Sequence, residues 1–299
     1  GVYYEGIGAG KREKYMKIRS ALLAAALALA LIGCQAEEPT GTDSIPPEPS
    51  PTVSAPPEAL TPEQLLARQP MDDTHDAFLV DTGGKLGTLL VTVEMGERGP
   101  NPDPEWEPWE NPVYLSVWNP ADMGEPIQRM DAVVDSLMFG EHETVDANFD
   151  GRMDFSVLRN RGNGAGYWYL WVWDEEAGQF AEVPEYREIS LPRCNPETGI
   201  IDGWARNSGG GDGVATFHRW EDRKLVCVRR IETGYDYENG VVKFEVSNEV
   251  TYFPSWIKVE ERIDGELTQV YYRYYSVDEG TDFFPEREKW ENLDYHGED

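Results

Sequence analysis

The chain has 299 residues, of which 56 are Asp or Glu and 26 are Lys or Arg, so its formal net charge is −30. Such a surface argues against nucleic acid and anionic lipid headgroups as partners, whereas cations and basic proteins would be attracted to it. The same acidity would also serve only to keep a domain soluble.

Residues 16–34, MKIRSALLAAALALALIGC, have the pattern of a bacterial export signal. Lys17 and Arg19 supply a positive start, and residues 21–32 form an apolar run that is too short for a comfortable membrane span. The run closes on Leu-Ile-Gly before Cys34, which resembles the lipobox in which the cysteine is lipidated. A plain secretory signal with an incidental cysteine is the alternative. We expect lipidation of Cys34 and a stable anchor of more than one acyl chain.

That anchor would hold the protein outside the cytoplasm. The expected place is the periplasmic face of the outer membrane in a cell with two membranes, or the cell surface in a cell with one. The stretch after Cys34 is rich in Pro, Glu, Ser and Thr, with too few apolar side chains to offset the entropy of ordering it. The expected division is an over-called extension at 1–15, a lipoprotein signal peptide at 16–33, a tether with one short helix at 34–71 and a single all-β domain at 72–299.

Short runs rich in Val, Leu and aromatic residues recur through the proposed domain, and clusters of turn residues separate them. AFLVD, GTLLVTVE and NPVYLSVW are examples, and no long stretch has helical periodicity. The pattern predicts an all-β fold of antiparallel meanders, arranged as a barrel, a sandwich or a small propeller. The run YWYLWVWD is apolar at consecutive positions, which predicts a strand buried on both faces.

The stretch DANFDGRMDF, residues 146–155, carries oxygen-bearing side chains at alternate positions, followed by a glycine and a further aspartate. This spacing is typical of a calcium loop, because calcium accepts mixed shells of carboxylate, amide and carbonyl oxygens. Gly151 permits the tight turn, and without a cation the converging carboxylates would repel one another. An Asx-rich turn that binds no metal is the alternative. The predicted Ca²⁺ ligands are the side chains of Asp146, Asn148, Asp150 and Asp154 and the backbone carbonyl of Arg152.

The same stretch is not an EF-hand. An EF-hand places a bidentate Glu at position 12 of the loop, between two helices. Counting from Asp146, position 12 is Val157, and the residues after the loop, FSVLRNRG, read as a strand. The sequence therefore predicts a calcium loop between two β-strands.

Two cysteines follow Cys34. Outside the cytoplasm, Cys194 and Cys227 could form a disulfide. Cys227 lies in the apolar run KLVCVRRI, so it fits equally well as a small buried hydrophobic residue. The sequence leaves both possibilities open.

Residues 127–230 resemble a bacterial family of lipobox-bearing, calcium-binding, β-propeller-like lipoproteins. The resemblance is carried by VDANFDGRMDFSVLRNRGNGAGYWYLWVWDEEAGQF and NPETGIIDGWARNSGGGDGVATFHRW. The best-understood members inhibit lysozyme-like peptidoglycan hydrolases. They act as immunity proteins against hydrolase effectors delivered by a type IV secretion system, and they are related to periplasmic inhibitors of invertebrate-type lysozyme. The resemblance implies a propeller-like fold that the calcium loop organises.

The resemblance also implies an inhibitory loop with a Ser-Gly motif and an aromatic side chain, which plugs the hydrolase cleft. Ser208 and Gly209 match the motif in ARNSGGGDG, whereas the expected tyrosine is absent and the next aromatic residue is Phe217. The same letters are typical of a flexible hairpin turn, which is the alternative. The expected partner is a basic peptidoglycan hydrolase, which this acidic chain would attract.

Motifs for catalysis are missing from the sequence. The histidines show no metal-protease spacing, and there is neither a G-x-S-x-G elbow nor a glycine-rich phosphate loop, so we expect no enzymatic activity. A glycosidase would need two carboxylates held a defined distance apart in a cleft. The alternatives to an inhibitor are a calcium-stabilised surface module that binds glycans or proteins, and a purely structural envelope lipoprotein. The tryptophans available for stacking on sugars, unless the core takes them, are Trp106, Trp109, Trp118, Trp204 and Trp220.

Overall fold

The computed structural model describes residues 60–97, 110–135, 139–162, 164–207, 212–245, 248–279 and 282–297. The predicted export signal, the predicted lipidation site Cys34 and the Ser208-Gly209 motif lie outside these ranges, as do Trp106 and Trp109. Within the described ranges, no helix has both the length and the apolar character that a membrane span requires.

The described part opens with the short helix that the sequence predicts, α2 (Pro62–Leu66). Thr61 caps it, because its hydroxyl accepts the N–H of Gln64 at 3.3 Å and its own N–H donates to the Gln64 side chain at 2.9 Å. Leu65 then packs with Ala77 and Leu90 of the first sheet, which fixes the helix against the domain.

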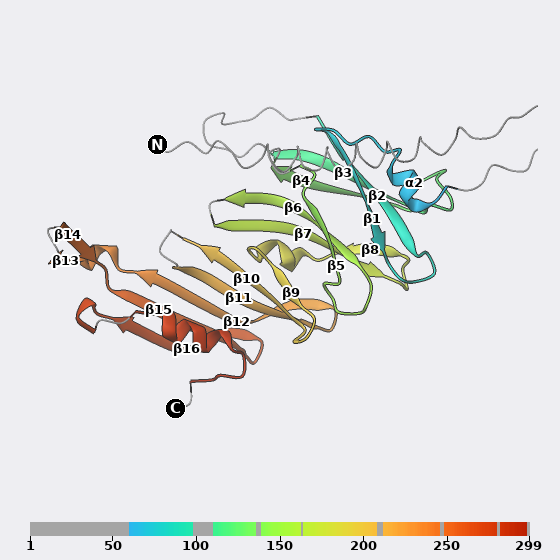
Figure 1. Ribbon diagram of the computed structural model, residues 1–299. Coiled ribbons are helices and arrows are strands. Elements are labelled where there is room, and N and C mark those ends of the chain that lie inside the picture. Colours follow the sequence, from blue (N-terminus) through green and yellow to red (C-terminus); the bar gives the residue numbers. More distant parts are fainter. Residues whose placement is uncertain are drawn as a thin grey trace, which may run out of the picture. The chain divides into compact units, whose positions relative to one another are not determined.

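The first sheet contains four antiparallel strands, each paired with the next along the chain (Figure 1). Residues at alternate positions of its central strands, among them Val91 and Leu115, are fully buried in one core, as the two-residue period of a strand requires. The strands are β1 (His75–Asp81), β2 (Thr88–Met95), β3 (Glu110–Trp118) and β4 (Gln128–Asp135).

The second sheet repeats this pattern with β5 (His142–Val145), β6 (Asp154–Gly162), β7 (Ala165–Asp174) and β8 (Gln179–Glu182). A 3₁₀ helix, η3 (Pro184–Glu188), follows it. The loop 146–153 connects β5 to β6, so the predicted calcium loop does lie between two strands. Val157 is buried within β6, which confirms that the loop is not an EF-hand.

Strand β7 is buried on both faces, as its unbroken apolar run predicts. Trp171 and Trp173 belong to the core that includes residues of the first sheet. Trp168 and Leu170, at the alternate positions, belong to a second core that includes Ile201 of the third sheet. One strand therefore contributes to two cores.

The third sheet contains six strands in the order β16-β15-β12-β11-β10-β9. The two-stranded sheet of β13 and β14 interrupts the sequence between β12 and β15, and the helix α3 (Phe284–Glu291) contributes Trp290 to the core of the third sheet. Two 3₁₀ turns, η4 (Tyr237–Asn239) and η5 (Val277–Glu279), connect neighbouring elements. The strands are β9 (Arg193–Asn195), β10 (Ile200–Arg206), β11 (Gly213–Glu221), β12 (Lys224–Tyr235), β13 (Val241–Glu245), β14 (Asn248–Tyr252), β15 (Ser255–Ile263) and β16 (Glu266–Tyr275).

The all-β, antiparallel part of the predicted fold is thus confirmed. Every strand pairing in the described residues is antiparallel, and each sheet is largely a meander of neighbouring strands. No closed barrel or propeller is found among the described residues, so the propeller-like arrangement is not shown.

The possible disulfide between Cys194 and Cys227 is not formed. The register places Cys194 beside Ile201, Ile201 beside His218 and His218 beside Cys227, so the two cysteines end a row across four strands. Three strand spacings separate them by roughly 14 Å, well beyond the Cα separation of a disulfide. Both thiols are free, and burial raises the pKa of Cys194 to about 11.

Arg229 of β12 is a buried cation, only 2% exposed, that connects the third sheet to the segment after α3. Its guanidinium forms an ion pair with Glu261 of β15 and donates to the carbonyls of Trp290, Asn292 and Tyr295 at 2.7, 2.8 and 2.8 Å. Carbonyls at a helix end have no partner within the helix, and Arg229 supplies donors to that of Trp290 and to two carbonyls in the segment after α3. The arginine thereby attaches the C-terminal helix to the sheet.

Replacing Arg229 by Met should lower the free energy of unfolding by roughly 3 kcal/mol, because it removes the arginine that pairs with Glu261 and that donates to the carbonyls of Trp290 and Tyr295. Urea denaturation followed by circular dichroism measures this loss. Arg219→Met removes an exposed arginine that pairs only with Glu221, and it should change stability by less than about 0.5 kcal/mol. Equal stability of the two variants would show that Arg229 does not attach the helix.

Candidate functional site

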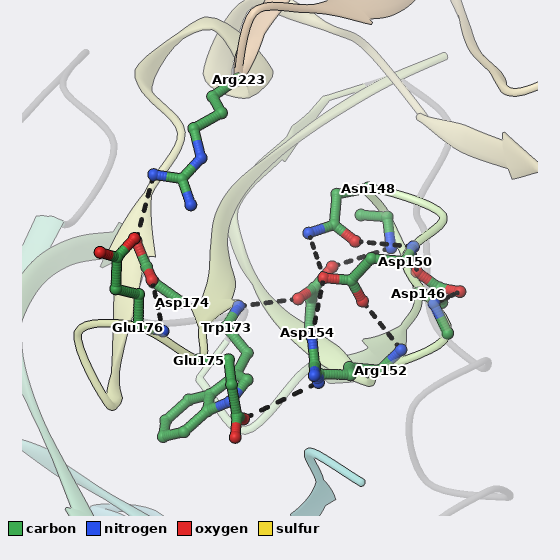
Figure 2. Close-up of polar contacts among 12 residues, drawn as sticks. Asp146, Asn148, Asp150, Arg152, Asp154, Trp173, Asp174, Glu175, Glu176 and Arg223 are labelled. Atoms are coloured by element: carbon green, nitrogen blue, oxygen red, sulfur yellow. Dashed lines mark hydrogen bonds and ion pairs between the residues drawn. The ribbon is translucent and has the colours of Figure 1, made fainter. Parts of the chain in front are cut away.

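The loop 146–153 folds around its own side-chain oxygens (Figure 2). Asp146 accepts two backbone N–H groups, those of Asp150 at 3.0 Å and Gly151 at 2.9 Å. The side-chain oxygen of Asn148 accepts the N–H of Asp150 as well, at 3.1 Å. Gly151 has φ of +85°, a conformation that suits a glycine and that makes this turn possible.

Asp150 continues the same pattern toward the second half of the loop. One of its oxygens accepts the N–H of Arg152 at 2.9 Å, and the other accepts the side-chain amide of Asn148 at 3.0 Å. The guanidinium of Arg152 lies 3.8 Å from Asp150. Each of these side-chain oxygens uses one lone pair for an N–H group and retains another that can face a cation.

Asp154 is fully buried at the start of β6. Its two oxygens accept the N–H of Ala147 at 2.9 Å and the N–H of Trp173 at 2.8 Å, so it connects the loop to the end of β7. Burial raises the pKa of this carboxyl to about 7, against the two N–H groups that lower it, and the negative charge of Asp150 raises it further. An ionised Asp154 is therefore unfavourable here unless positive charge lies nearby.

Trp220 of β11 connects the same loop to the third sheet. Its indole N–H donates to the carbonyl of Ala147 at 2.8 Å. Ala147 is fully buried, and side chains satisfy both of its backbone polar groups. Its carbonyl accepts the indole N–H of Trp220, and its N–H donates to Asp154. The position of the loop thus depends on two residues that are 66 positions apart in the chain.

The structure brings all the predicted calcium ligands into one loop, yet it directs Asp154 inward to backbone N–H groups. Within the described ranges, no group of three or more His, Cys, Asp or Glu side chains is arranged to hold a metal ion. Calcium binding therefore stays a prediction that rests on the donor set Asp146, Asn148, Asp150, Arg152 and Asp154 and on the buried carboxyl of Asp154.

A cavity of about 790 Å³ lies beside the loop. Nε of Arg152 lies 3.8 Å from Oε2 of Glu175, and Nη1 of Arg223 lies 3.7 Å from Oδ2 of Asp174. Figure 2 marks both ion pairs with dashed lines. The indole of Trp173 donates to Glu175 at 3.0 Å. Sequence reasoning missed this cavity, because its lining comes from four separate segments at 148–152, 172–176, 181–185 and 220–224.

The three described tryptophans of the glycan hypothesis are all half-buried. The indole N–H of Trp118 donates to the hydroxyl of Thr92 at 3.0 Å, and that of Trp220 donates to Ala147. The ring of Trp204 carries the guanidinium of Arg287, 3.9 Å from its centroid. Each ring therefore already has a contact within the domain.

Comparison with known proteins adds little to this picture. No protein-family model matches the sequence, and no curated protein matches it. A solved structure described as a Xanthomonas Type IV Secretion System related protein aligns with a TM-score of 0.40 and 16% identity, over 65% of this chain and 93% of that chain. A similarity of this size carries no argument about family or function.

Trp220→Phe should free the loop while keeping an aromatic ring in the core. The loss of one hydrogen bond to a buried carbonyl should lower the free energy of unfolding by about 1 kcal/mol. Hydrogen exchange of the loop amides, Asp150 and Gly151 among them, should be faster in the variant than in the original chain, whereas exchange in β6 and β7 should change little. Trp256→Phe changes an indole on β15 and should leave these loop amides unchanged; identical loop exchange in the two variants would contradict the role of Trp220.

Proposed function

We propose that the protein is a lipid-anchored envelope protein that binds Ca²⁺ structurally and inhibits a lysozyme-like peptidoglycan hydrolase without catalysing a reaction itself. The observation that carries the proposal is the loop 146–153 between two strands, with its clustered oxygens and the buried Asp154 behind it. This loop is also the most specific part of the resemblance to the family of calcium-binding lipoprotein inhibitors.

The donor set fits calcium in chemistry. Asp146, Asn148, Asp150 and Asp154 would supply side-chain oxygens and Arg152 its carbonyl, a shell of hard oxygen ligands. A bound cation supplies the positive charge that offsets these carboxylates. A calcium-bound loop would then stabilise the fold, because Asp154 connects the loop to β7 and Trp220 connects it to the third sheet.

The proposed inhibitory residues, Ser208 and Gly209, lie in the connection between β10 and β11. Both residues lie outside the described part of the chain, and their proposed role rests on their match to the Ser-Gly motif of the family resemblance. The net charge of −30 supports a basic hydrolase as the target, because opposite charges accelerate association. Cys34 would keep the inhibitor at the membrane, outside the cytoplasm.

Removal of calcium should destabilise the protein. EDTA should lower the melting temperature by several degrees, and added Ca²⁺ should restore it. Asp150→Ala should abolish the response to Ca²⁺. Glu266→Ala, which removes an equal charge from an exposed position on β16, should retain the response. A melting temperature that changes with neither EDTA nor Ca²⁺ would overturn the metal assignment.

The calcium response should also depend on pH. The pKa of Asp154 is raised from 3.8 to about 7, so the metal-free folded protein retains a proton that the unfolded chain has lost between these values. Its stability therefore falls as pH rises through this window. Calcium should raise the melting temperature more at about pH 8, where Asp154 is ionised, than at about pH 5. An equal rise at both pH values would show that ionisation of Asp154 is not coupled to calcium binding.

Inhibition can be tested with purified cell walls and a panel of lysozymes of different types. The protein should slow lysis by at least one basic member, with a faster association at low salt. Replacing both Ser208 and Gly209 by Ala should weaken inhibition without changing the melting temperature. The matched control replaces Gly210 and Gly211 of the same segment by Ala. Pull-down on peptidoglycan without inhibition of any hydrolase would favour the alternative, a calcium-stabilised glycan- or protein-binding module.

A further inference from the structure

A second cavity, of about 900 Å³, lies beside α3 on the third sheet. It differs from the rest of this acidic chain in its charge, because Arg193, Arg206 and Arg287 line it with only two carboxylates, Asp202 and Glu291. The cavity therefore carries a formal excess of one positive charge in a chain whose net charge is −30.

Two of the arginines are held in place by the protein. Arg287 lies over the ring of Trp204, 3.9 Å from its centroid, and donates to Glu291 at 2.7 Å. Arg193 donates to Asp202 at 2.7 Å. A guanidinium fixed through one edge still offers donors on its other edges, so these arginines are oriented before any ligand arrives.

Arg206, at the end of β10, is different. It is exposed, and its guanidinium has no ion pair or hydrogen bond among the described residues. Its donors are available to an anion in the cavity.

The rim of the same cavity exposes apolar side chains. Phe284 is 42% exposed and Leu191 is 38% exposed. Leu191 also has φ of +48°, a left-handed conformation that is unfavourable for a residue other than glycine. Strained residues of this kind gather at ligand-binding sites, where the surrounding structure holds them.

We propose that this cavity binds an anionic sugar, with the carboxylate or phosphate paired by Arg206 and its two neighbouring arginines and the sugar ring placed against Phe284 and Leu191. Arginine matches the geometry of both oxyanions through paired N–H groups, and aromatic and aliphatic side chains contact the apolar face of a ring. The inference depends neither on the calcium loop nor on hydrolase inhibition.

Calorimetric titration of the full chain with three sugars tests the proposal. N-acetylmuramic acid carries a carboxylate, N-acetylglucosamine 6-phosphate carries a phosphate, and N-acetylglucosamine carries neither. At least one anionic sugar should bind, and the neutral sugar should bind at least tenfold more weakly than that anionic sugar. The stronger of the two anionic sugars identifies the preferred oxyanion.

Two variants locate the site. Arg206→Gln removes the arginine without a partner, so it should fold normally and weaken binding of the anionic sugar about tenfold or more. Arg223→Gln removes an exposed arginine from the cavity beside the loop and should leave binding unchanged. Absence of binding by both anionic sugars, equal binding of the neutral sugar, or an unaffected Arg206→Gln variant would each overturn the proposal.

Discussion

Burial of both faces of β7 is the constraint on which the rest of the structure depends. A strand that carries large apolar side chains at successive positions cannot remain at a surface, so one core must form on each side of it. The first core includes residues of the first sheet and the second includes residues of η3 and the third sheet. Asp154 then fixes the end of this strand, because it accepts the N–H of Trp173 and that of Ala147. The loop 146–153 is consequently part of the central packing of the domain.

Local patterns determined what the sequence could predict. The capping box at Thr61, the two-faced burial of β7 and the strand that follows the loop depend on neighbouring residues, and the structure has all three. The state of Cys194 and Cys227 depended on strand register, which composition does not specify. Arg229 lies in an apolar run, and nothing nearby in sequence indicated that Glu261 and the carbonyls after α3 would surround it. Both cavities escaped prediction because each assembles segments that are far apart in the chain.

The distribution of charge separates two surfaces of different character. Around the loop, carboxylates outnumber the cations that compensate them, and Arg152 and Arg223 reach Glu175 and Asp174 only at 3.8 and 3.7 Å. In the cavity beside α3, three arginines outnumber two carboxylates. A cation at the first place and an anion at the second would each reduce a local imbalance. The calcium site proposed at the loop and the anion site proposed beside α3 thus differ in charge, and the proposals are independent of each other.

The attachment of α3 through Arg229 has a consequence for the order in which the chain folds. The first two sheets pair each strand with its neighbour in sequence, so their contacts are local and can form early. The partners of Arg229 at Trp290 and Tyr295 lie 61 and 66 residues further along the chain. Until those residues are available, Arg229 has Glu261 as its ion-pair partner, but the N–H groups that donate to the carbonyls of Trp290 and Tyr295 have no acceptor. Docking of α3 and of the segment after it onto the third sheet therefore depends on contacts between residues far apart in the chain, which generally form more slowly than the neighbouring strand pairings of the first two sheets.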